Sequence, residues 1–98
     1  MVSIMTFNNF LQLIDNINQD FYFYVRVNEK DLPLSKITVS SNDFLAYPGK
    51  HAVTKRKIVK LFKNMHNRGL SLYIFYHNQR IPVYGIQISI ENTSVTLM

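Results

Sequence analysis

The chain has 98 residues, a size typical of one domain, and 47% of them are apolar, enough for one hydrophobic core. It contains no cysteine, which excludes disulfides, thiolate zinc sites and cysteine nucleophiles. No apolar run is long enough to cross a bilayer, and the first residues lack the basic segment of a signal peptide. We therefore expect a single cytoplasmic domain over residues 1–98, with no membrane association.

The first half of the chain predicts one helix and two strands. Residues 6–19 carry apolar side chains at helical spacing, with Thr6 as N-cap. Residues 21–27 alternate as a strand, and a long loop over 28–35 leads to a second strand at 36–40. Residues 41–47 suggest a short helical turn, which Pro48 and Gly49 end.

The second half predicts a longer helix followed by three strands. Thr54 caps a helix over residues 54–68, and residues 70–77 alternate as a strand with a turn at 78–79. Residues 80–90 form the next strand, in which the apolar residues change face at Gly85, so we expect a bulge or bend there. The last strand covers residues 94–97.

The order α-β-β-α-β-β-β indicates an α+β fold. Because hairpin connections pair strands antiparallel, we predict a two-layer sandwich of two helices packed on a four- to five-stranded, mainly antiparallel sheet. The predicted core consists of Phe10, Ile14, Phe23, Val25, Ile37, Leu61, Phe62, Leu72, Ile74, Ile86 and Ile88.

Charge is distributed unevenly along the chain, whose formal net charge is +5. Three basic and five acidic residues precede Gly49, whereas eight basic residues and one acidic residue follow from there to the end. Arg56, Lys60, Lys63 and Asn67 would form one ridge on the predicted helix, opposite its apolar stripe. Like charges at this spacing destabilise a helix, and an anionic partner would relieve the repulsion. The alternative is a lysine-rich face that is merely solvated.

Phosphates are the anions that such a ridge fits best, because lysine and arginine gain from counterion release along a polyanion. The predicted nucleic-acid-binding residues are Lys50, Lys55, Arg56, Lys57, Lys60, Lys63, Asn67, Arg68 and Arg80. An aromatic group, Tyr22, Tyr24, Tyr73 and Phe75, would share the second face of the sheet. These rings could stack on unpaired bases, but burial in a homodimer is the more common role of such a face.

Catalytic and metal-binding patterns are missing. His51, His66 and His77 are too far apart for a local metal motif, and no carboxylate lies between Asp43 and Glu91 to orient any of them. We therefore predict no enzyme activity, no cofactor, no metal and no small-molecule substrate. The favoured function is a small module that binds DNA or RNA through the helix at 54–68. The alternative is a homodimeric protein-interaction module without a nucleic-acid role.

Overall fold

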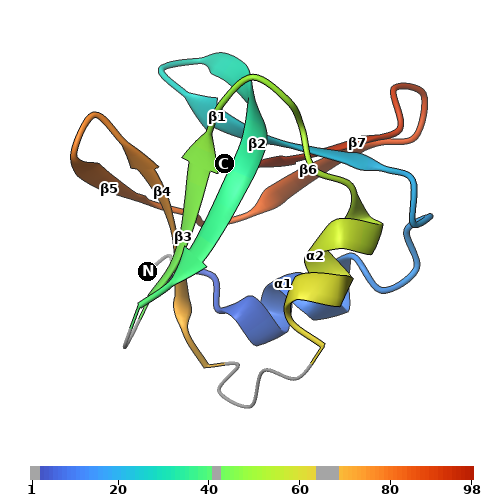
Figure 1. Ribbon diagram of the computed structural model, residues 1–98, viewed down its shortest axis with the longest axis horizontal. Helices are drawn as coiled ribbons and strands as arrows, with labels where there is room; N and C mark the ends of the chain where they lie inside the picture. The colour runs from blue at the N-terminus through green and yellow to red at the C-terminus, as the bar shows by residue number, and fades with distance from the viewer. Residues whose placement is uncertain (1–2, 41–42, 64–68) are drawn as a thin grey trace.

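The computed structural model describes residues 3–40, 43–63 and 69–98. These residues form a strand-rich fold in which two short helices lie together at one end of the molecule (Figure 1). In chain order the elements are α1 (Phe7–Leu13), β1 (Tyr22–Val27), β2 (Lys30–Val39), β3 (Asp43–Pro48), α2 (Lys55–Leu61), β4 (Ser71–Tyr76), β5 (Gln79–Pro82), β6 (Ile86–Ser89) and β7 (Ser94–Leu97).

The strands form one mixed sheet of seven strands in the order β5-β4-β3-β2-β1-β7-β6. The pairs β3·β4 and β1·β7 are parallel, and the remaining neighbours are antiparallel. The predicted two-layer sandwich on four to five mainly antiparallel strands is therefore wrong, although the fold is still α+β. Hairpin reasoning missed the parallel pairs because they join segments that are distant in the sequence.

The two ends of this strand order are joined through residues 83–85. Val83 donates its N–H to the Leu72 carbonyl and so extends the β4·β5 ladder, at an N···O distance of 3.1 Å. The N–H groups of Tyr84 and Gly85 donate instead to the Met98 carbonyl, beside β7. Residues 83–85 therefore pair first beside β4 and then beside β7. This transfer brings the two ends of the sheet together, so the sheet is curled. The bend expected near Gly85 is this transfer.

Two segments that we predicted as irregular are strands. Asn28 and Glu29, with φ of 52° and 66°, make a two-residue turn, so β2 begins at Lys30 where we expected a loop over 28–35. The helical turn predicted over 41–47 is also wrong, since β3 begins at Asp43. Three successive residues of β3, Phe44, Leu45 and Ala46, are buried, as expected for a central strand covered on both faces.

Both predicted helix starts are confirmed, but the helices end early. The backbone N–H of Asn9 donates to Thr6 Oγ1, and that of Lys57 donates to Thr54 Oγ1. α1 ends at Leu13 and α2 at Leu61, whereas we expected helices to residues 19 and 68. Residues 64–68, the last part of the predicted second helix, lie outside the described part of the chain.

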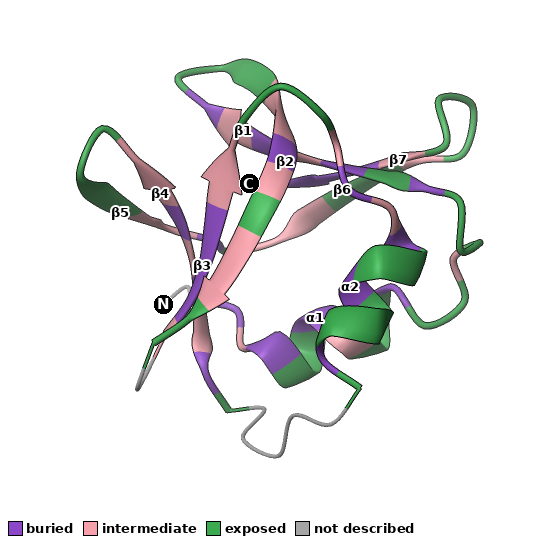
Figure 2. Ribbon diagram, viewed as in Figure 1, coloured by how far each residue is buried: buried purple, intermediate pink, exposed green. Residues whose placement is uncertain are grey.

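Phenylalanine rings join the helices to the sheet. Phe7 on α1 lies 4.7 Å from Phe44 on β3 and 4.9 Å from Phe62 at the end of α2, measured between ring centroids. Phe10 packs edge-on against Phe23 of β1 at 5.8 Å. The buried positions gather between the helices and the strands (Figure 2). These rings form the centre of the core.

Most of the predicted core is confirmed. Phe10, Ile14, Phe23, Val25, Phe62, Leu72 and Ile74 are buried, and Ile37 and Ile86 pack against the core while partly exposed. The expectation was wrong for Leu61 and Ile88, which are 55% and 41% exposed. Leu61 lies beside the stripe that Ile58 and Phe62 direct inward, and Ile88 is on the outermost strand.

We predict opposite outcomes for two neighbouring residues. Phe62→Ala should lower the free energy of unfolding by about 3–5 kcal/mol, because it leaves a cavity against Phe7 and Phe44. Leu61→Ala should cost less than about 1 kcal/mol, because that side chain is already in water. Urea denaturation of the two variants measures the difference. Equal losses would contradict the packing of the α2 end.

Candidate nucleic-acid interface

A strap formed by residues 49–54 crosses the start of β1 and the middle of β2 and builds the candidate site. The N–H of Val53 donates to the Leu34 carbonyl on β2, and its carbonyl accepts from the N–H of Phe23 on β1, at 2.8 and 2.9 Å. The N–H of Gly49 donates to the Pro33 carbonyl at 2.9 Å. Backbone hydrogen bonds to two strands therefore fix the strap.

A bulge in β2 receives this strap. The register against β3 shifts between Leu34 and Lys36, which leaves Ser35 as the extra residue. Ser35 Oγ donates to the His51 carbonyl at 2.7 Å and accepts from the His51 N–H at 3.2 Å. A Cβ on Gly49 would lie only 2.4 Å from Ser35 Oγ, so only glycine fits at this crossing. The bulge and Gly49 together set the path of residues 50 and 51.

The strap, the bulge and the start of α2 surround a shallow depression that we call the basic depression. Lys50, His51 and Lys57 are all exposed, and no carboxylate is among the lining residues. Several of its backbone and hydroxyl donors are already hydrogen-bonded within the protein, so the two lysine charges are its main attraction for an anion. The full lining is Ser35, Lys50, His51, Ala52, Val53, Thr54 and Lys57.

The structure divides the predicted ridge on α2. Arg56 pairs with Asp20 at 3.2 Å, and that carboxylate would repel a phosphate there. Lys63 does not line the basic depression. It lines a groove between the helices that also contains Asp15. Lys60 is exposed one turn after Lys57 and makes no ion pair with any described residue.

Lys55 is buried, and its role is structural. The residue is only 6% exposed, and its Nζ donates to the carbonyls of Asp15 and Ile17 at 3.0 and 2.7 Å. These carbonyls follow the end of α1, where a cation is favourable. Lys55 therefore fastens α2 to α1 and presents no charge to a ligand.

The remaining predicted binding residues, and Arg26 on β1, do not extend the basic depression. Arg80 on β5 forms an ion pair with Asp43 of β3. Asn67 and Arg68 lie outside the described residues. On β1, Arg26 donates to Asp31 and to Gln87, each at 2.8 Å, and the hydrogen bond that it donates to Asp31 raises the pKa of the guanidinium. The exposed lysines beside the strap are thus the basic side chains that the structure brings together.

The predicted aromatic group is also divided. Tyr22 and Tyr24 are on β1, whereas Tyr73 and Phe75 are on β4, and β2 and β3 lie between the two strands. Tyr47 of β3 takes the place of the β1 tyrosines, with its ring centroid 5.2 Å from that of Phe75. Sequence reasoning missed Tyr47 because residues 41–47 were predicted as a helical turn. The available signal was the short apolar run Phe44-Leu45-Ala46-Tyr47 before Pro48 and Gly49, which is also typical of a buried strand.

Searches for other chemistry and for relatives found nothing further. No group of three or more histidine, aspartate or glutamate side chains gathers within residues 3–40, 43–63 and 69–98 as it would around a metal ion. Neither helix in this part of the chain has the length and apolar character needed to span a membrane. The sequence matches no protein-family model, and it has no significant match among the curated proteins or the solved structures compared with it. Function must therefore be argued from the surface itself.

A substitution at Lys55 separates its structural role from binding. Lys55→Met keeps most of the aliphatic stem but removes the ammonium, so two carbonyls near the end of α1 lose their donor. We expect the free energy of unfolding to fall by about 1–3 kcal/mol, with unchanged nucleic-acid affinity for the folded fraction. Thermal unfolding and a binding titration at low temperature provide the two readouts. A large loss of affinity without a loss of stability would place Lys55 in the interface instead.

Proposed function

We propose that this protein is a small nucleic-acid-binding module that contacts the phosphate backbone through the basic depression. The observation that carries the proposal is the convergence of Lys50, His51 and Lys57 on one depression whose lining contains no carboxylate. Lys60 continues the positive surface along α2. The proposal replaces the predicted ridge with a site that combines the strap and the first turn of α2.

The physical basis is electrostatic. Each lysine that neutralises a phosphate releases condensed counterions, so affinity depends on salt and scarcely on base sequence. The hydrogen bonds of the strap hold the backbone of residues 49–54 before a ligand arrives, which lowers the entropy lost on binding. The surface supports contact with the backbone of either DNA or RNA.

A pair of double variants tests the position of the site. Lys50→Gln/Lys57→Gln removes two charges from the basic depression, and Lys30→Gln/Lys63→Gln removes two charges elsewhere. Lys30 lies at the β1–β2 turn and is not among the residues that line the basic depression, and Lys63 lies in the groove between the helices. Both doubles therefore change the net charge equally while only one changes the proposed site.

We expect the first double variant to weaken binding and to flatten its salt dependence. Two lost phosphate contacts should reduce the slope of log affinity against log salt by about 1.8 on duplex DNA, or about 1.4 on a single strand. The control variant, Lys30→Gln/Lys63→Gln, should retain most of the wild-type affinity and most of the wild-type salt dependence. Fluorescence anisotropy with labelled oligonucleotides at several salt concentrations measures these values. Equal effects of the two doubles, or no wild-type binding in about 50 mM salt, would contradict the proposed function.

A further inference from the structure

The outer face of β2, β3 and β4 carries an aromatic surface that the phosphate contacts do not use. It consists of Tyr47, Tyr73 and Phe75, which we call the aromatic platform. Leu45 is paired with Tyr73 across the parallel β3·β4 ladder, and Tyr47 follows two residues later, so all of these side chains share one face. Each platform ring is half-buried, and Leu45 beneath them is buried.

A lysine already lies over this surface. Lys36 is directly opposite Tyr47 in the β2·β3 ladder, and its Nζ is 5.4 Å from the ring centroid. Thr38 Oγ1 lies 3.5 Å from Tyr47 Oη. The Tyr47 ring therefore extends over β2 and contacts Phe75 on its other side. A cation above a ring at an exposed site is held weakly, so an incoming base can replace it.

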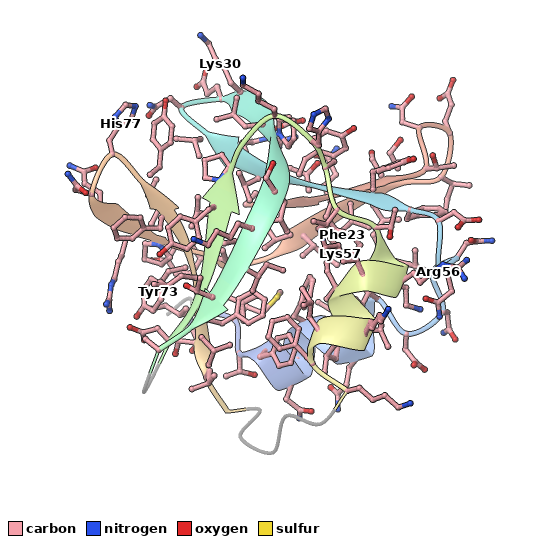
Figure 3. All side chains as sticks on the ribbon, in the orientation of Figure 1. Phe23, Lys30, Arg56, Lys57, Tyr73 and His77 are labelled. Carbon is pink, nitrogen blue, oxygen red and sulfur yellow. The ribbon has the colours of Figure 1, made fainter. Side chains whose placement is uncertain are left out.

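The aromatic platform and the basic depression are neighbours along the chain on β2 and β3. Ser35 of the depression precedes Lys36, and Tyr47 is separated from the strap only by Pro48. In Figure 3, β2 and β3 lie between Tyr73 on one side and Lys57 on the other. A ligand that crosses these two strands can therefore meet both surfaces.

We infer that the basic depression and the aromatic platform bind one ligand together, a single-stranded nucleic acid. Its phosphates lie in the basic depression, while one or two unpaired bases stack on Tyr47 and Phe75. Lys36, displaced from the Tyr47 ring, turns to a neighbouring phosphate. This inference rests on the proposed function, to which it adds the class of nucleic acid.

The charge and shape of the surface favour a single strand over the alternatives. A duplex keeps its bases stacked inside and offers only phosphates, so it leaves the aromatic platform unused. An acidic protein would satisfy the lysines but supplies no flat π-surface for three adjacent rings. A single strand provides both phosphates and unpaired bases. Proteins that bind single strands without sequence preference use aromatic side chains beside a positively charged groove.

The first experiment uses the wild-type protein and three ligands of about 12 nucleotides. These are an oligothymidylate, a strand of the same length without bases, and a blunt duplex. We expect the oligothymidylate to bind more tightly than the abasic strand by about 5- to 150-fold for each stacked base. The oligothymidylate should also bind more tightly than the duplex, because the duplex offers no unpaired base to the rings. Equal affinity for the two single strands would overturn the inference and leave the proposed function intact.

The second experiment places the stacking site. Tyr47→Leu and Phe75→Leu should each reduce the preference for the oligothymidylate over the abasic strand by at least about fivefold. Tyr47→Phe should retain the preference, because the ring remains. Tyr22→Leu is the matched control, since Tyr22 is 47% exposed on β1, away from the platform. A loss of preference in the Tyr22 variant, or its retention in both platform variants, would contradict the assignment.

The aromatic platform could instead be a dimer interface, and sedimentation of the wild-type protein and the same variants tests this role. We expect the wild-type protein to stay monomeric at high concentration. A dimer that Tyr47→Leu and Phe75→Leu dissociate would show that a second copy covers these rings, and would overturn the inference. If the protein binds none of the three ligands, that result would instead contradict the proposed function itself. The two failures are thus distinguishable.

Discussion

The packing of phenylalanines between the helices and the sheet is the constraint on which the rest of the structure depends. Phe7 and Phe10 of α1 contact Phe44 of β3, and Phe62 reaches the same rings from the end of α2. Neither seven-residue helix is long enough to be stable in water alone. Burial of these rings therefore holds both helices in place, and with them the strap that precedes α2.

From this core, a series of tight contacts leads to the surface. Lys55 fastens the start of α2 to the carbonyls after α1, and Val53 bridges β1 and β2 immediately before it. Ser35 and Gly49 then fix the strap where it crosses the bulge. Lys50, His51 and Lys57 emerge from backbone that is hydrogen-bonded on both sides. The basic depression is consequently set by the fold, even though its cations are exposed.

Local features of the fold could be predicted from the sequence, whereas pairings between distant segments could not. Both N-caps, the strand at residues 21–27 and the final strand follow from spacing and residue type, and the structure confirms them. The parallel pairs β3·β4 and β1·β7 depend on tertiary contacts that no local pattern encodes. The error at β3 also hid Tyr47, because a residue expected in a helical turn was not considered for a sheet face.

The candidate site shows the same division. Charge patterning indicated Lys50, Lys57 and Lys60, but it could not separate them from Lys55, which folding buries, or from Arg56 and Arg80, which meet distant carboxylates. A sequence gives the number and order of charges, and their partners come from the tertiary structure. The proposed surface therefore combines fewer cations than the sequence suggested with Tyr47, an aromatic residue that the sequence did not indicate.

We propose that the strap, β2, β3 and β4 together bind a nucleic-acid strand. Titration of the isotopically labelled protein with an oligothymidylate, followed by amide chemical shifts, tests it most directly. We expect the amide shifts of residues 34–38, 47–57 and 73–75 to change, and added salt to reverse these changes. Changes confined to the groove between α1 and α2 or to the β6–β7 edge would contradict it, as would a spectrum that does not change in about 50 mM salt.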